Sequence, residues 1–87
     1  MFYVYVLKSL VNSRYYIGHT NDINSRLRKH NNGNVRSTRN LRPWMLLGFE
    51  VYEKRNEARS REHELKNHGT KRNEFIKSLE ENIKQIA

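Results

Sequence analysis

Cysteine is absent from this sequence of 87 residues, which excludes a disulfide framework and a zinc site built on thiolates. The glycines form no phosphate-binding loop, which argues against nucleotide hydrolysis. The sequence also contains no apolar run of membrane-spanning length and no secretion signal at its start, so we expect a soluble, cytoplasmic protein without a membrane partner. The short length predicts one domain over residues 1–87, with a thin hydrophobic core.

Acidic residues are scarce in the first half of the chain. Residues 1–49 contain eight lysine or arginine side chains and one acidic side chain, Asp22, whereas residues 50–87 contain nine basic and eight acidic ones. The formal net charge of +8 therefore lies almost entirely in the first half, where a polyanion such as DNA would bind. A generically basic surface is the alternative. The lack of paired carboxylates in this half also excludes a two-metal nuclease centre there.

The spacing of apolar residues and the positions of turn residues predict the order strand, strand, helix, strand, helix, helix. We expect strands over residues 2–7, 14–19 and 44–52, and helices over residues 21–31, 55–67 and 71–86. The first strand is apolar on both faces, so it should be an inner strand. This order predicts an α+β fold, in which a three-stranded antiparallel sheet is flanked by helices.

Four further features refine this prediction. Gly18, near the end of the second strand, indicates a bulge or a close backbone approach. We expect Gly69 to interrupt the helical structure between the last two helices. Residues 34–43 have no apolar period and should form an exposed loop or a short helical turn. The last helix has a core-facing apolar stripe, made of Phe75, Ile76, Leu79, Ile83 and Ile86.

Two predicted helices carry polar side chains where an apolar stripe is expected. In the first helix, Arg26 and His30 lie on the face that Ile23 and Leu27 begin. In the second helix, Glu62 takes the middle position of a sparse apolar stripe. A buried carboxylate is costly unless it is paired or bound to a cation, so these inward polar groups predict a shared site for a phosphodiester.

Each inward polar side chain also has a purely structural interpretation. Glu62 could form an ion pair with Arg59 or Lys66 on its own helix. Arg26 could pair with a carboxylate, Glu62 included, and His30 could be a packed, hydrogen-bonded side chain. His19, His63 and His68 show no persuasive zinc-ligand spacing.

The chemistry of these residue types suits phosphoryl transfer. The planar fork of Arg26 can hold two phosphate oxygens and stabilise charge in the transition state. His30 has a reference pKa of ~6.5, which suits proton transfer near neutrality. A lone carboxylate such as Glu62 suits magnesium, which often takes one or two protein ligands and completes its shell with water and phosphate.

Aromatic residues in the predicted strands allow two interpretations. Tyr5 and Tyr16 could simply pack, or they could line the site. A phenol has a reference pKa of ~10 and is a poor base unless nearby cations or a metal-bound water lower that value, which the basic first half could provide. Trp44 could stack on a base or, as an aromatic residue of an inner strand, belong to the core.

These residues together resemble the motifs of the GIY-YIG nuclease superfamily. The pattern is Tyr3-Val4-Tyr5, then Tyr16-Ile17-Gly18, then Arg26, His30 and Glu62. The segments YYIGHTNDINSRLRKHNNG, VRST with RPW, and EARSREHELK are similar to those of its small stand-alone, excinuclease-like members. The resemblance covers residues 1–78. It departs from the family at Tyr3-Val4, where the family name has Gly-Ile.

The resemblance implies cleavage of DNA phosphodiesters with one divalent metal ion, Mg²⁺ or Mn²⁺. Tyr5 and Tyr16 would line the site, and one of them would activate or orient the attacking water. Arg26 would stabilise the pentacovalent phosphate, His30 would assist proton transfer or position a tyrosine, and Glu62 would bind the metal. Many relatives use an asparagine downstream of that glutamate, and Asn73 is the nearest candidate here.

The leading hypothesis is therefore a metal-dependent DNA endonuclease or nickase that selects DNA structure rather than sequence. Its expected backbone contacts come from four basic residues, Lys29, Arg36, Arg39 and Arg42. A separate protein partner could supply targeting. The rival hypothesis is a nucleic-acid-binding module with weak or no cleavage.

Overall fold

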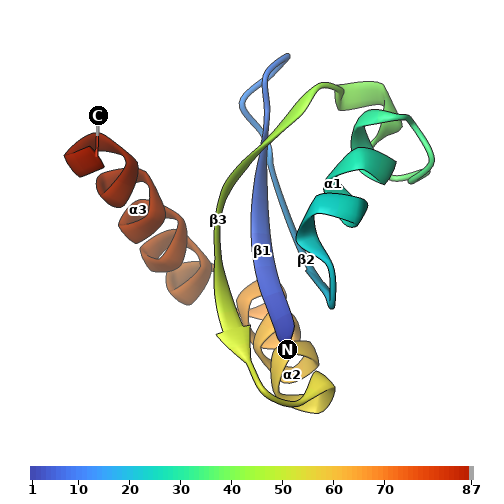
Figure 1. Ribbon diagram of the computed structural model, residues 1–87. Helices are drawn as coiled ribbons and strands as arrows, with labels where there is room; N and C mark the ends of the chain where they lie inside the picture. The colour runs from blue at the N-terminus through green and yellow to red at the C-terminus, as the bar shows by residue number, and fades with distance from the viewer. Residues whose placement is uncertain (87) are drawn as a thin grey trace.

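The computed structural model describes residues 1–86, with side chains through residue 83, and confirms the predicted order of elements (Figure 1). The strands are β1 (Phe2–Ser9), β2 (Tyr15–Thr20) and β3 (Trp44–Tyr52). The helices are α1 (Ile23–Asn31), α2 (Arg55–Asn67) and α3 (Gly69–Ile86), and a 3₁₀ turn, η1 (Arg39–Leu41), precedes β3. The strands form one antiparallel sheet in the order β2-β1-β3, so β1 is the inner strand and the predicted α+β fold is confirmed.

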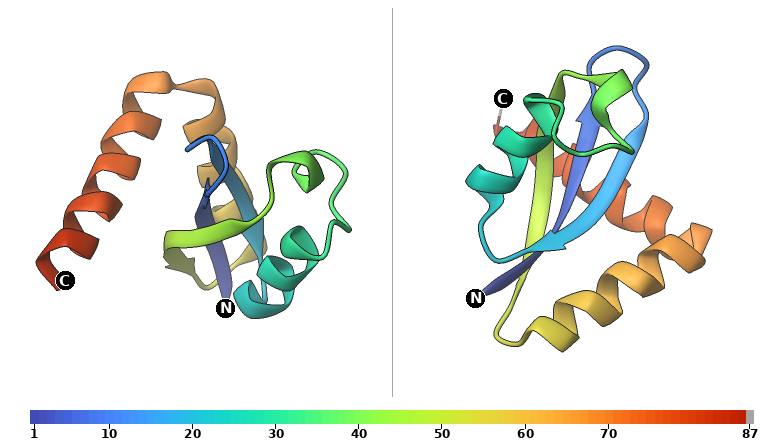
Figure 2. Two further views of the ribbon diagram at one scale, coloured as in Figure 1. Left: turned by 90° about the horizontal axis from the view of Figure 1, so that it is seen from above. Right: turned by 90° about the vertical axis from the view of Figure 1, so that its right-hand side faces the viewer.

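The helices cover opposite faces of the sheet (Figure 2). Helix α1 lies on one face, and helices α2 and α3 lie on the other. Alternation along β1 serves both faces, because Val4 and Val6 point toward α2 and α3 whereas Tyr5 and Leu7 point toward α1. All four of these side chains are almost completely buried. A strand that is apolar on both faces is thus explained by helices on both sides.

The two faces have different cores. The face toward α2 and α3 holds an aliphatic cluster with one buried aromatic ring, made of Val4, Val6, Ile17, Leu47, Ala58, Leu65, Phe75, Ile76 and Leu79. The face toward α1 holds a smaller, more aromatic cluster of Tyr5, Leu7 and Trp44, with Tyr16, Leu27, Leu41 and Leu46 packed against it. We call these the aliphatic core and the aromatic core.

Helix α1 is fixed at both ends by side chains that the sequence shows. Asp22 is its N-cap and accepts a hydrogen bond from the Ser25 amide at 3.1 Å, so the helix begins at Ile23 rather than at residue 21. At the other end, the Asn31 amide accepts from the Trp44 backbone N–H at 2.7 Å and donates to the Trp44 carbonyl at 3.0 Å. These bonds join the end of α1 to the start of β3.

Other boundaries differ from the prediction by one or two residues. Strand β1 continues to Ser9, which pairs with Trp44 and donates its hydroxyl to the Leu41 carbonyl at 2.7 Å. Gly69 is the first residue of α3 and does not itself interrupt the helical structure. The turn between α2 and α3 lies at His68, which has an extended backbone (φ −129°, ψ 94°). In the apolar stripe of α3, Phe75, Ile76 and Leu79 are buried as predicted. Ile83 is exposed, so its predicted place in the core is wrong, and the side chain of Ile86 lies outside the described residues.

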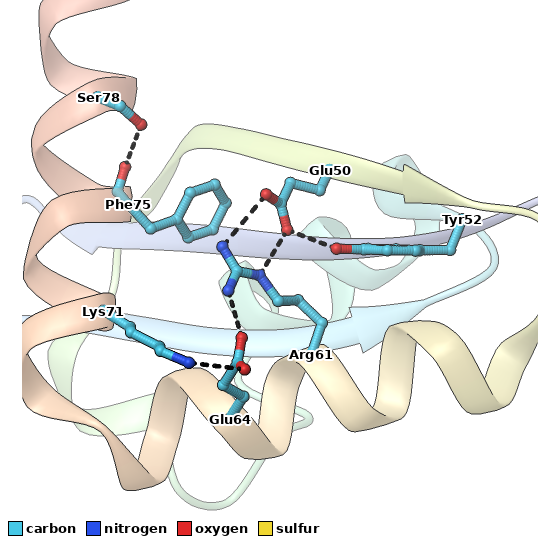
Figure 3. A network of polar contacts seen from close by, with 7 residues as sticks. All are labelled: Glu50, Tyr52, Arg61, Glu64, Lys71, Phe75 and Ser78. Atoms are coloured by element: carbon cyan, nitrogen blue, oxygen red, sulfur yellow. Dashed lines mark hydrogen bonds and ion pairs between the residues drawn. The ribbon is translucent and has the colours of Figure 1, made fainter.

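A polar network ties α2 and α3 to the edge strand β3 (Figure 3). Arg61 on α2 donates from Nε to Glu50 on β3 at 3.0 Å and also pairs with Glu64. Glu64 accepts from Lys71 on α3 at 3.1 Å, and the Arg61 guanidinium lies 5.5 Å from the centre of the Phe75 ring. These pairs hold the helices against the sheet at the edge opposite β2. None of the helices in residues 1–86 is long and apolar enough to cross a membrane.

Candidate active site at the edge of strand β2

A chain of buried hydrogen bonds joins β1, α1 and the loop before η1. His30, in the last turn of α1, is completely buried, and its Nε2 lies 3.0 Å from the Tyr5 hydroxyl. Its Nδ1 lies 2.8 Å from the hydroxyl of Thr38, which is also buried. The inward direction of His30 is therefore correct, and its partners are one strand residue and one loop residue. The sequence alone predicts no role for Thr38, because the loop that contains it has no periodic pattern of apolar residues.

The neighbours of this chain determine where its protons lie. The Arg26 Nε–H points at the Tyr5 oxygen at 3.4 Å, and the Thr38 hydroxyl points at the Val35 carbonyl at 3.4 Å. Because Arg26 can only donate, the Tyr5 proton is left for His30 Nε2. We therefore assign the His30 proton to Nδ1, from which it is donated to Thr38. Every member of the chain then has a partner.

Burial keeps both central groups uncharged at neutral pH. Burial, with the nearby Arg26 charge, lowers the pKa of His30 to about 4. Burial raises the pKa of Tyr5 to about 12, although the hydrogen bond from Arg26 acts in the opposite direction. The expectation that the basic first half would lower the phenol pKa is thus wrong for Tyr5, since loss of solvent outweighs the neighbouring cation.

Gly18 explains how the Tyr5 ring reaches this position. A Cβ atom at residue 18 would lie 2.6 Å from the Tyr5 hydroxyl oxygen, so only glycine leaves room for the phenol. The close approach predicted for Gly18 is correct, and the register between β1 and β2 is regular there. Tyr16, also on this face, is only partly buried, and its ring centre lies 4.9 Å from that of His30. Tyr16 is therefore the more accessible of the two tyrosines.

Glu62 lies beyond the other face, on α2, and has two partners among the described residues. Its Oε2 lies 3.4 Å from Lys66 Nζ, which is one of the ion pairs expected on the helix itself. Its Oε1 lies 2.9 Å from Nδ1 of His19 on β2. The prediction missed His19, although strand alternation places it on the same face as Ile17, the face that α2 covers.

The two polar groups lie on opposite faces of the sheet, and both influence Tyr5 near the edge strand β2. Strand β2 is an edge strand, so side chains from α1 and α2 can approach each other past it. The Arg26 charge lowers the pKa of Tyr5 and the Glu62 charge raises it, so both charges act on the same phenol. Lys66, the partner of Glu62, lies 5.5 Å from the centre of the Tyr16 ring. The charges of Arg26 and Glu62 thus both influence Tyr5, and Lys66 connects Glu62 with the Tyr16 ring.

Two hollows flank this point along the seam between β2 and α2. The first, of about 530 Å³, is lined by Arg14, Tyr16, Lys66, Arg72 and Asn73, among others. The second, of about 500 Å³, is lined by His19, Asn56, Arg59, Ser60, Glu62 and His63. Asn73, the candidate for the downstream asparagine, therefore lines the first hollow, as Tyr16 does. Basic side chains occur in both hollows, which suits a negatively charged chain.

The residues expected to contact DNA lie on the other side of the aromatic core, at the end of α1 and around η1. Lys29, Arg36, Arg39 and Arg42 are all exposed. Arg42 is partly committed to structure, because its Nε donates to the Arg39 carbonyl at 2.7 Å and its guanidinium lies against Gly33. Trp44 is 4% exposed and donates from its indole to the Thr38 carbonyl at 2.9 Å, so its core interpretation is correct and base stacking is excluded.

The donor set at the β2 edge fits a magnesium-type ion better than a closed metal cage. In the part of the chain that the structure describes, no three histidine, aspartate or glutamate side chains gather at one point. The Glu62 carboxylate is 19% exposed and borders an open hollow. One carboxylate with space for water and phosphate is the arrangement that Mg²⁺ and similar ions accept.

Comparisons with known proteins agree with the fold and with the family that the sequence resembles. Residues 1–77 match the family described as the GIY-YIG catalytic domain. A UPF0213 protein of Clostridium perfringens is 43% identical over 67 residues, which are 76% of this chain and 71% of that protein. A UPF0213 protein of Haloquadratum walsbyi is 40% identical over 67 residues, 76% and 74% of the two chains. The solution NMR structure of a UPF0213 protein from Bacillus halodurans is similar with a TM-score of 0.55 and 31% identity, covering 91% of this chain and 85% of that one.

Proposed function

This chain belongs to the GIY-YIG family, and from that premise we propose that it is a divalent-metal-dependent DNA endonuclease that hydrolyses a phosphodiester with water. The proposal is supported by the charges of Arg26 and Glu62, which come from helices on opposite faces of the sheet and both act on the pKa of Tyr5, next to the edge strand β2. One scissile phosphate at this edge would contact a fixed cation on one side and a carboxylate-bound metal ion on the other.

Arg26 is the group that contacts the phosphate on the α1 side. Its guanidinium is held near Tyr5, and the same phenol and the Tyr16 oxygen raise its pKa, so it stays charged at any working pH. A fixed guanidinium stabilises negative charge that develops on the phosphate oxygens in the transition state. It needs no reorganisation at that moment, because the hydrogen bond to Tyr5 already orients it.

The two tyrosines have different roles in this proposal. Tyr16 is partly exposed at the edge and can contact the attacking water directly. Tyr5 is 2% exposed, and its proton is directed at His30, so it acts as a positioning residue for Arg26. His30 in turn holds the Tyr5 hydroxyl and is itself held by Thr38. With a His30 pKa of about 4 and a Tyr5 pKa of about 12, this chain does not ionise at rest.

Glu62 would hold the Mg²⁺ or Mn²⁺ ion, which supplies charge stabilisation and a more acidic water when bound. Its carboxylate is kept at the edge by α2 and is neutralised in part by Lys66 at 3.4 Å. Lys66 also lies over the Tyr16 ring, and this contact offers it an alternative position when a divalent cation takes its place beside Glu62.

DNA would follow the seam between β2 and α2, where both hollows open. Arg14, Lys66 and Arg72 would contact backbone phosphates in the first hollow and Arg59 in the second. The basic residues at the end of α1 and around η1 would contact a more distant part of the duplex. Such contacts carry no base information, so we propose selection of DNA structure rather than sequence.

Nicking of supercoiled plasmid in Mg²⁺ or Mn²⁺ tests the proposal. Wild type should nick, and Glu62→Gln should lose the activity because the variant keeps the shape but not the charge that holds the metal. Glu74→Gln is the matched control, since Glu74 is an exposed residue of α3 that lines neither hollow. Nicking that persists in Glu62→Gln would refute the assignment.

A nucleic-acid-binding module is the second candidate, and one observation favours it. Glu62 already has two partners, His19 and Lys66, so its inward position has a structural explanation without metal. In this case wild type would bind DNA in both EDTA and Mn²⁺ and would nick no DNA structure in either condition.

A further inference from the structure

We propose that His19 is a second protein ligand of the metal ion, beside Glu62, and that the site consequently prefers a first-row transition ion to Mg²⁺. This inference rests on the proposed function, because it places the ion at Glu62. It goes beyond that function by naming a ligand that the sequence motifs do not include and by fixing the class of metal.

The distance between the two donors matches one edge of a coordination octahedron. His19 Nδ1 and Glu62 Oε1 lie 2.9 Å apart. Two adjacent ligands at about 2.1 Å from an octahedral ion lie roughly 3.0 Å from each other. Both atoms are therefore close enough to bind one ion, once Nδ1 has lost its proton and the imidazole has turned so that this nitrogen faces the ion instead of Glu62 Oε1.

The surroundings leave room for the other ligands. His19 and Glu62 border the same hollow of about 500 Å³, and their side chains are 25% and 19% exposed. Water and a phosphate oxygen can thus complete the shell, as is usual for ions held by only one or two protein side chains. Lys66 lies near the other carboxylate oxygen, Oε2, so the edge between Oε1 and Nδ1 is the side left for a cation.

The imidazole has a proton arrangement that allows this role. Without metal, Nδ1–H donates to Glu62. When an ion binds, the proton is carried by Nε2, and the Nδ1 lone pair faces the ion. This exchange between the two neutral forms of the ring needs no further reactant.

An imidazole nitrogen changes which ions the site takes. Mg²⁺ strongly prefers oxygen donors, whereas first-row transition ions accept imidazole, with affinities that rise from Mn²⁺ to Ni²⁺. A site made of Glu62 alone would treat Mg²⁺ and Mn²⁺ alike. A site made of Glu62 and His19 would bind Mn²⁺ more tightly than Mg²⁺.

Metal titration of the full chain, without DNA, tests the inference independently of activity. We would measure Mn²⁺ binding by electron paramagnetic resonance and Mg²⁺ binding by competition. His19→Ala should weaken Mn²⁺ binding by roughly tenfold and Mg²⁺ binding by less than twofold. His63→Ala is the matched control, since this histidine lines the same hollow, and it should change neither affinity.

Pulsed electron paramagnetic resonance of bound Mn²⁺ separates a ligand from a mere positioning residue. Wild type should show coupling to a directly bound nitrogen, which requires no folded variant, and the coupling should disappear in His19→Ala and persist in His63→Ala. A wild-type spectrum without nitrogen coupling would overturn the inference, as would an equal loss of Mg²⁺ and Mn²⁺ affinity in His19→Ala. If Glu62→Gln leaves Mn²⁺ binding intact, the metal assignment of the proposed function fails instead.

Discussion

The two faces of the sheet have different kinds of buried side chains, although the same strands supply both. Toward α2 and α3, the buried residues are almost all aliphatic and make no side-chain hydrogen bonds. Toward α1, the buried set includes Tyr5, His30 and Thr38, which form a continuous chain of hydrogen bonds. A buried row of hydrogen-bonded polar side chains adds less stability than apolar packing of equal volume. We therefore expect the aromatic core mainly to orient Arg26 and the aliphatic core mainly to stabilise the fold.

This division explains why the candidate site lies at the edge of β2 rather than in either core. Arg26 is fixed by the polar chain on one face, and Glu62 is carried by a helix anchored in the aliphatic core on the other. Both charges act on the pKa of the Tyr5 phenol, Arg26 lowering it and Glu62 raising it. Changes in one core should therefore affect folding, and changes in the other should affect the site.

The largest expected effect comes from the aliphatic core. Leu79 on α3 packs directly over Gly48 of β3, far from the β2 edge. Leu79→Ala should lower the free energy of unfolding by about 2–5 kcal/mol, measured by denaturant titration, because it leaves a cavity. The nicking rate per folded molecule should be unchanged. A lower rate in the fully folded variant would show that the two faces are not independent.

Arg26→Ala is the matching change on the other face. It should reduce the nicking rate by roughly 10²–10³-fold, since it removes a charge that acts on the transition state. DNA affinity in EDTA, measured by fluorescence anisotropy, should fall far less. An equal loss in nicking rate and DNA affinity would show that Arg26 only binds the DNA backbone and does not stabilise the transition state.

The pH dependence of stability should identify His30. Its pKa is about 4 in the folded chain and near 6.5 when unfolded, so below pH 6.5 the unfolded state binds the proton more readily. Stability from this residue is complete above pH 6.5 and falls by about 3 kcal/mol as the pH approaches 4. His30→Gln should show a flatter profile over this range in denaturant titrations. Parallel profiles for the two proteins would contradict the buried, neutral imidazole.

Thr38→Val gives the smallest effect of the series. The substitution keeps the shape but leaves the buried His30 Nδ1–H without an acceptor, and it should destabilise the fold by about 1–3 kcal/mol. Thr38→Ser keeps the hydroxyl and should recover most of that loss. If valine and serine behave alike in thermal unfolding, the hydroxyl does not hold the imidazole.

Local pattern was enough to predict the sheet and the inward polar residues. Both faces of β1 could be predicted because every side chain of residues 2–7 is apolar or aromatic. Arg26 and His30 stood out because they interrupt a helical stripe. The resemblance to the GIY-YIG family, which the match over residues 1–77 confirms, supplied the expected roles, and these roles stay predictions.

Partners that are distant in the sequence could not be predicted in this way. His19 and Glu62 are in contact although they lie 43 residues apart in the sequence. The sequence around either residue does not indicate that the other is its partner. Thr38 lies in a loop without a period, so its burial follows only from the packing of α1 and β3 around it. The raised pKa of Tyr5 likewise depends on burial, which composition and local charge cannot reveal.

A crystal structure with Mn²⁺ and a short DNA duplex would test the central claim most directly, with anomalous scattering to locate the ion. We predict one Mn²⁺ peak at the Glu62 carboxylate and one backbone phosphate that contacts both this ion and the Arg26 guanidinium at the edge of β2. A phosphate that reaches the ion but not Arg26, or an ion bound elsewhere, would contradict the account.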